Sequence, residues 1–120
     1  MRRFRLSRLA EADLAGIMAA SRRQWGAAGE RRYAALLAAA LRRVAADPEG
    51  PATRDREELQ LGIRSFHLRH ARGDAVEGRV SRPVHVLYYR ALTADLIEIV
   101  RVLHERMEPS RYLSEASEEE

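Results

Sequence analysis

The stretch Val84–Leu103, VHVLYYRALTADLIEIVRVL, decides the fold. Two segments in it, Val84–Tyr89 and Leu96–Leu103, are apolar on both faces of an extended chain. Such segments are typical of strands in the interior of a sheet, where both faces are covered. The intervening residues Arg90–Asp95 are predicted to form the turn between these two strands. The stretch therefore predicts an antiparallel strand pair at the centre of the molecule.

A third strand is predicted just upstream, over Ile63–His70, where apolar and polar residues alternate. Ile63 is out of phase with Phe66, which predicts a bulge near Arg64. The polar segment Ala71–Arg82 contains two glycines and is interpreted as a long hairpin loop. These connections make the three strands an antiparallel meander.

The N-terminal region predicts a strand followed by a helix. Arg3–Leu6 alternates charged and apolar residues, as a short half-buried strand does. Ser7 stands at the N-cap position of a helix that covers about residues 8–25. Gly26 and Gly29 then mark a break in the helical pattern.

A second helix follows the break and carries the clearest helical periodicity in the chain. Its apolar stripe begins at Tyr33 and ends at Val44, and Asp47-Pro48 terminates it. The short connection between the two helices predicts an antiparallel helix hairpin. The predicted fold class is thus α+β: an N-terminal strand, an antiparallel helix hairpin, and a three-stranded antiparallel meander against which the hairpin packs.

Length and composition predict one globular domain. The chain has 120 residues, which suits a single core, and we assign residues 1–113 to it and residues 114–120 to an acidic, disordered tail. There is no cysteine, which excludes disulfides, thiolate metal ligands and thiol catalysis. All 21 basic residues are arginine, so no lysine can act as a base or form a Schiff base. The N-terminus lacks a long apolar run, so we expect neither a signal peptide nor a membrane span, and a cytoplasmic location.

Charge is concentrated in the N-terminal third. Residues 1–43 contain ten arginines and three acidic residues, a net charge of +7. This asymmetry predicts an acidic partner, either nucleic acid or an acidic protein segment, and the alternative is a solvated pair of helix faces. Trp25 and Tyr33 flank the break between the helices, where they either close the core or anchor a partner.

No motif for a metal, a cofactor or nucleophilic catalysis is present. His67, His85 and His104 fall on three successive predicted strands, so they either converge in space or are independent residues of the strands. They lack the spacing of a metal site, and we expect no metal and no cofactor.

Several segments together resemble the ParE branch of the RelE/ParE toxin superfamily. The opening Phe4-x-Leu6-Ser7 and Ala12-Asp13-Leu14-x-x-Ile17 is similar to the start of these toxins, and Asp47-Pro48 and Leu61-Gly62-Ile63-Arg64 match their linker and next strand. The most specific part is Ile99–Leu113, IVRVLHERMEPSRYL, in which a strand ends in a Leu-His pair and runs on to a closing leucine. The resemblance covers about residues 3–113.

The resemblance implies a bacterial type II toxin that inhibits growth by poisoning DNA gyrase, trapping cleaved DNA and blocking replication, rather than by hydrolysis. It implies a ParD-like antitoxin whose amphipathic, acidic C-terminal segment neutralises the toxin, with DNA contacted only through the antitoxin and no membrane partner. The residues expected to contact the target are Arg101, His104, Arg106, Met107 and Tyr112. Those expected to contact the antitoxin are Trp25, Arg31, Arg32, Tyr33 and Leu37.

Two alternatives remain open at this point. The RelE branch consists of ribosome-dependent mRNA interferases, and Arg64, Arg106 and Tyr112 match the arginines and tyrosine that such an endoribonuclease uses in catalysis. The lysines of that branch are absent here, and Leu103-His104 favours ParE. The other alternative is a non-toxic module that only binds an antitoxin.

Overall fold

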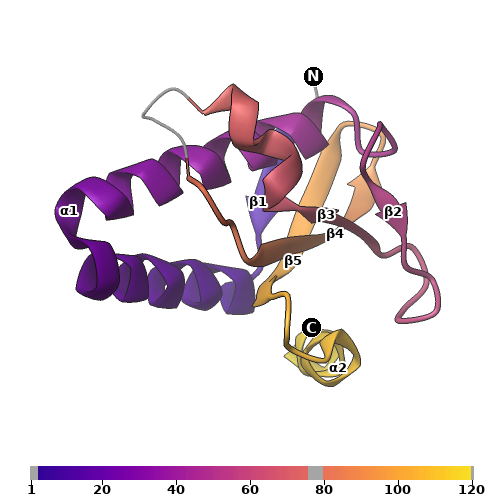
Figure 1. Ribbon diagram of the computed structural model, residues 1–120. Helices are drawn as coiled ribbons and strands as arrows, with labels where there is room; N and C mark the ends of the chain where they lie inside the picture. The colour runs from indigo at the N-terminus through magenta and orange to yellow at the C-terminus, as the bar shows by residue number, and fades with distance from the viewer. Residues whose placement is uncertain (1–2, 76–79, 120) are drawn as a thin grey trace.

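A mixed five-stranded sheet forms the centre of the molecule (Figure 1). The computed structural model describes the backbone of residues 3–75 and 80–119 and the side chains as far as Ser114. The strands and helices are β1 (Arg3–Leu6), α1 (Arg8–Ala46), β2 (Arg54–Asp55), β3 (Arg64–His67), the 3₁₀ helix η1 (Leu68–Asp74), β4 (His85–Thr93), β5 (Leu96–His104) and α2 (Pro109–Glu119). Within the described residues, no helix is both long and apolar enough to cross a membrane.

The sheet has the order β1-β5-β4-β3-β2. Strands β3, β4 and β5 pair antiparallel, as the predicted meander requires. The sheet is larger than predicted at both edges, because β1 pairs parallel with β5 and the two-residue β2 pairs antiparallel with β3. Two parallel strands must be joined by a connection that crosses from the end of one strand to the start of the other. Here the connection from β1 to β5 starts with the helical segment α1 and continues through the other strands.

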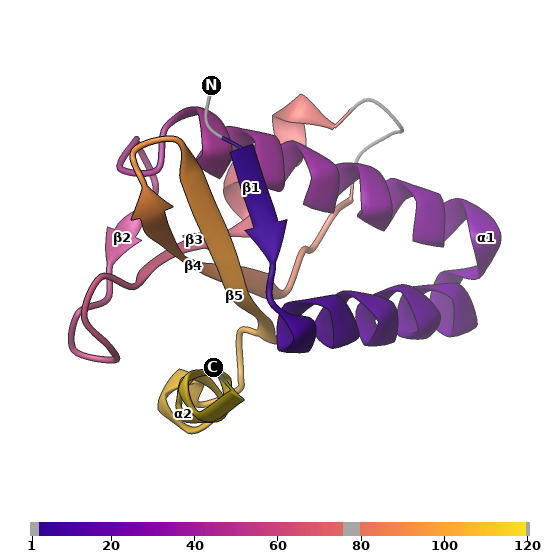
Figure 2. The same ribbon diagram turned by 180° about the vertical axis from the view of Figure 1, so that it is seen from behind.

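The helical segment α1 consists of two helical arms joined by a kink at Gly26. Gly26 has φ 74° and ψ −174°, a conformation that glycine adopts without the steric cost of a side chain. Figures 1 and 2 show the consequence, two arms of α1 that run back along each other as a hairpin. At the start of α1, the Ser7 hydroxyl accepts a hydrogen bond from the amide of Ala10 at 3.0 Å, the expected N-cap.

Each face of the sheet has its own core. The α1 face buries Leu36 and Leu37 from the second arm against Phe66, Tyr89 and other apolar side chains of the strands. The opposite face is covered at one end by α2, whose Leu113 is buried with neighbours from the strands (Figure 2). The residues of this second core are Ile63, Tyr88, Val100, Leu103 and Leu113.

The boundaries of two strands, β3 and β4, differ most from the prediction. Strand β3 begins at Arg64 and ends at His67, where a strand was expected over Ile63–His70. The reason is local: the Nδ1 of His67 accepts a hydrogen bond from the amide of Arg69, which starts η1. Strand β4 continues to Thr93, so the segment predicted as a turn is mostly strand.

The bulges also lie elsewhere than expected. The register of β4 and β5 shifts between Tyr88 and Tyr89 and between Ala91 and Thr93, rather than near Arg64. At the C-terminus, the backbone is helical from Pro109 to Glu119, where the sequence indicated disorder from Ser114 onward. That this region and the rest of the chain form a single domain stays a prediction.

Candidate functional site

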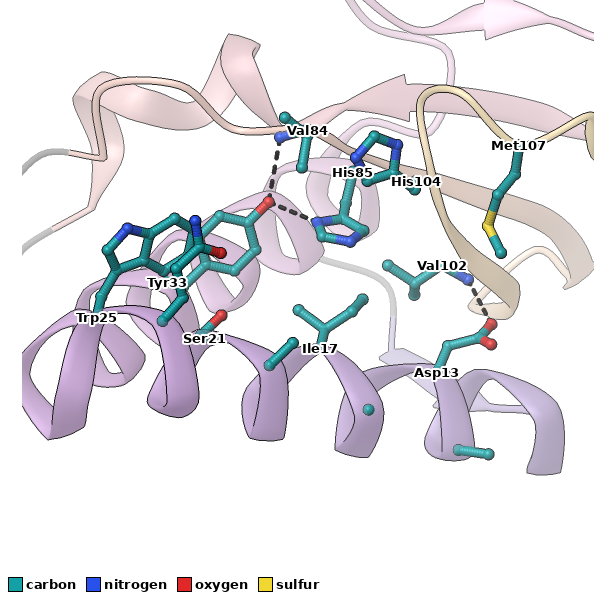
Figure 3. A pocket seen from close by; sticks show the side chains of 14 residues that line it. Asp13, Ile17, Ser21, Trp25, Tyr33, Val84, His85, Val102, His104 and Met107 are labelled. Atoms are coloured by element: carbon teal, nitrogen blue, oxygen red, sulfur yellow. Dashed lines mark hydrogen bonds between the residues drawn. The ribbon is translucent and has the colours of Figure 1, made fainter.

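A groove of about 470 Å³ lies between the first arm of α1 and the adjoining ends of β4 and β5 (Figure 3). Its helical wall is formed by residues four apart on one helix face, Asp13, Ile17, Ser21 and Trp25, with small residues beside them. Glycine and alanine at these neighbouring positions leave the wall open. The small residues are Ala12, Gly16 and Ala20.

A polar pair lies in the opposite wall. The Tyr33 hydroxyl lies 2.6 Å from the Nδ1 of His85 and accepts a hydrogen bond from the Val84 amide at 3.2 Å. Burial raises the pKa of Tyr33, so the phenol keeps its proton at neutral pH. The hydroxyl and Nδ1 of His85 therefore form a hydrogen bond in the wall of the groove.

His85 is neutral because of where it lies. Burial, the main cause, and the neighbouring imidazole of His104 together lower the pKa of its imidazole to about 4. The two rings pack edge to face with centroids 5.5 Å apart, and the two residues are directly paired between β4 and β5. His85 is therefore uncharged at neutral pH.

His67, the third histidine of the strands, has a separate partner. Its Nδ1 accepts from the Arg69 amide, so Nε2 carries the proton and donates to Glu105 at 2.7 Å. Among the described residues, no group of three or more histidines and carboxylates could hold a metal ion. Of the three histidines considered together from the sequence, His85 and His104 have rings in edge-to-face contact.

The buried imidazole predicts a pH dependence of stability. The pKa of His85 is depressed in the folded state, so between pH 6.5 and pH 4 the unfolded chain binds the extra proton and acid favours unfolding. From pH 7 to pH 5 we expect His85 to account for a loss of about 2 kcal/mol in the free energy of unfolding. Urea unfolding at both pH values, for the unchanged chain and for His85→Gln, measures this. An equal pH dependence in both proteins would contradict the assignment.

An exposed tryptophan stands at one end of the groove. Trp25 is 51% exposed, and its ring stacks on Tyr33 with centroids 6.5 Å apart. Gly29 permits this placement, because a Cβ there would lie 2.3 Å from the Cβ of Trp25. Met107, 38% exposed, lines the groove as well. Exposed aromatic and methionine side chains beside an apolar groove are typical of a surface that binds another protein.

The residues expected to contact an antitoxin divide into two groups. Trp25 and Tyr33 line the groove, and Arg32 lines an adjoining hollow of about 200 Å³ with both of them. Arg31 is exposed on the hairpin. Leu37 is buried like Tyr33 in the core on the α1 face, but unlike Tyr33 it lines neither the groove nor this hollow.

Some of the residues expected to contact the target lie at the surface, and Arg101 is buried. His104 and Met107 line the groove, and Arg106 is exposed in the turn after β5. Arg101 is buried and joins three elements: its guanidinium donates to both carboxylate oxygens of Asp13 at 2.8 Å and to the Tyr112 carbonyl at 3.1 Å. Its guanidinium carbon also lies 5.5 Å from the centre of the Tyr112 ring.

The three residues considered for ribonuclease activity lie on different elements: Arg64 on β3, Arg106 in the turn after β5 and Tyr112 on α2. Arg64 donates to the Pro48 carbonyl at 3.1 Å, and that carbonyl also accepts from Tyr89, a residue of the α1-face core. Tyr112 packs against the core on the opposite face. The structure does not bring Arg64 and Tyr112 together.

Two features of the site were not found in the sequence. One is Asp13, which pairs with Arg101 and also accepts the Val102 amide at 2.9 Å. The other is the groove wall of small residues that begins at Ala12. The spacing of Ile17, Ser21 and Trp25 placed them on one helix face, but which strand faces them depends on tertiary packing.

Comparison with known proteins gives consistent matches. A family model described as the ParE toxin of the type II toxin-antitoxin system parDE matches residues 4–109. Toxin ParE of Escherichia coli is 35% identical over 108 residues, covering 90% of this chain and 89% of that protein. Toxin ParE1 of Caulobacter vibrioides is 35% identical over 113 residues, covering 94% and 99%. Toxin ParE1 of Mycobacterium tuberculosis is 32% identical over 111 residues, covering 92% and 97%.

Proposed function

Because the chain belongs to the ParE toxin family of type II toxin-antitoxin systems, we propose that it inhibits DNA gyrase and is neutralised by a ParD-like antitoxin. In this proposal the toxin acts in the bacterial cytoplasm, traps gyrase on cleaved DNA and so blocks replication. The antitoxin covers the toxin with an amphipathic, acidic segment, and the toxin is inactive while this segment is bound.

The groove beside Trp25 is the observation that carries the antitoxin part of the proposal. An apolar groove with an exposed aromatic side chain suits the apolar face of a helix, which inserts side chains at three- and four-residue spacing. Arginines of the hairpin, among them Arg31 and Arg32, suit the acidic residues of the same segment, since complementary charge speeds association and apolar anchors supply affinity.

The target surface is assigned to the end of β5. His104, Arg106 and Met107 follow one another there, and each is at least partly exposed. Arg101 and Tyr112 hold this end of β5 against α1 and α2, so we assign them a positioning role. The separation of Arg64 from Tyr112 supports inhibition by binding over hydrolysis of mRNA.

The proposal predicts a specific pair of assay results. We expect the purified protein to inhibit supercoiling by gyrase and to accumulate cleaved DNA, while a coupled translation reaction yields intact mRNA. Adding the antitoxin should abolish the gyrase effect. Cleaved mRNA with unaffected gyrase would instead support the ribonuclease alternative and overturn the assignment of the target.

A growth assay tests the remaining alternative, a non-toxic module that only binds an antitoxin. Induced expression of the chain without its antitoxin is expected to stop growth, and co-expression of the neighbouring antitoxin gene is expected to restore it. Normal growth together with co-purification of the antitoxin would contradict the toxin assignment and favour the binding module.

A further inference from the structure

Strand β1 is an edge of the sheet. Among the described residues it pairs only with β5, and Figure 2 shows it as the outermost strand. The amides of Arg3 and Ser7 donate to carbonyls at the two ends of this pairing, Asp95 and Ile99. Alternate residues of a strand direct their main-chain groups to opposite sides, so those of Phe4 and Leu6 point away from β5. They are placed to pair with another strand.

A row of charged residues crosses the sheet next to this edge. Glu98 of β5 is paired in register with Arg5 of β1 and Arg90 of β4. Its side chain is only 4% exposed. One carboxylate oxygen accepts from Arg5 at 3.2 Å and the other from Arg90 at 3.0 Å. The buried carboxylate therefore fixes two guanidinium groups in position beside the edge.

The row forms part of an open cleft of about 680 Å³ with a positive charge. Three arginines and one carboxylate line it, a net charge of +2, and the Arg5 side chain is 58% exposed. Leu6 and Leu92 add apolar surface to the same cleft. The cations are Arg5, Arg8 and Arg90.

We propose that β1 accepts a strand from a partner protein in which acidic and apolar residues alternate. A strand added to the outer side of β1 directs every second side chain to the face of Arg3 and Arg5, where carboxylates are favoured. The other side chains of the added strand lie on the face of Phe4, where apolar side chains are favoured. Phe4 itself is 40% exposed.

Charge and main-chain geometry select this occupant over two others. A second copy pairing through β1 would bring its own arginines close to Arg3 and Arg5, and like charges across a strand pair are destabilising. A nucleic acid would satisfy the arginines but has no main chain to pair with Phe4 and Leu6. The inference does not depend on gyrase as the target.

The test uses a labelled peptide in which glutamate and valine alternate, titrated into the full chain at low salt. We expect saturable binding, and slower hydrogen exchange of the Phe4 and Leu6 amides when the peptide is bound. Phe4→Pro removes an outward amide without touching the β1–β5 hydrogen bonds, and it should weaken binding at least 10-fold. A melting curve checks that this variant stays folded.

A charge-matched pair of variants separates a defined site from general attraction. Arg3→Glu with Arg8→Glu should weaken peptide binding at least 10-fold, whereas Arg23→Glu with Arg42→Glu, the same charge change on exposed positions of α1, should change it less than 3-fold. Equal losses in both, or binding without protection of the Phe4 and Leu6 amides, would overturn the proposal. Tighter binding of a single-stranded oligonucleotide, abolished by the first pair alone, would also overturn it. Gyrase and growth assays test the proposed function separately.

Discussion

Replacing Asp13 by asparagine is expected to lower the free energy of unfolding by about 3–5 kcal/mol, because it removes the negative charge from a buried, two-point ion pair with Arg101. The Asp13 and Arg101 side chains are 14% and 7% exposed, and both carboxylate oxygens lie 2.8 Å from guanidinium nitrogens. Asparagine keeps the shape and one acceptor oxygen but loses the charge. The loss is large against the 5–15 kcal/mol that stabilises a typical domain.

The same change should also loosen α2, since Arg101 connects Asp13 of α1 to the Tyr112 carbonyl. Urea unfolding measures the stability, and protease cleavage near Leu113 measures the release of α2. The matched control is Glu30→Gln, which breaks the ion pair with Arg22, whose side chain is 66% exposed. It should cost less than about 1 kcal/mol. Similar costs for both variants would show that Arg101 is not held by charge pairing.

Local patterns were sufficient to predict most of the fold. The apolar segments at β4 and β5, the stripe after Tyr33 and the break at Gly26 each depend on neighbours in the sequence, and all three predicted features are present. Strand β2 was not predicted, because two residues carry no periodicity. The end of β3 was also missed, since Phe66 and Leu68 are both buried and the same spacing suits a strand or a 3₁₀ turn.

The site was predictable only in part, for a related reason. Trp25 was singled out because it flanks the helix break, where closure of the core and an anchor for a partner were both open, and His104 because a strand ends there. The buried state of Arg101 was not predictable, since its partner Asp13 is 88 residues away in the sequence. Leu37 was predicted to contact the antitoxin because an apolar helical stripe does not reveal which of its residues face the sheet and which face a partner.

Replacing Trp25 by alanine is expected to weaken antitoxin binding by at least 30-fold while growth arrest is retained. A central aromatic anchor in a protein interface contributes about 2 kcal/mol or more when truncated to alanine, and 2 kcal/mol is about a 30-fold change in affinity. Trp25 is half-exposed, so the fold loses little when it is removed. The variant should therefore remain toxic and no longer be rescued by the antitoxin.

The control for this experiment is Leu61→Ala, which removes another exposed apolar side chain, 82% exposed and outside the groove. It should leave antitoxin affinity and rescue unchanged. Calorimetric titration of both variants with the antitoxin gives the affinities, and co-expression gives the growth phenotype. If Trp25→Ala binds the antitoxin as tightly as the unchanged chain, the antitoxin does not occupy the Trp25 end of the groove, and the arginines alone must account for recognition. If the variant also loses toxicity, the target and the antitoxin compete for the same tryptophan, and neutralisation is direct occlusion of the surface that contacts gyrase.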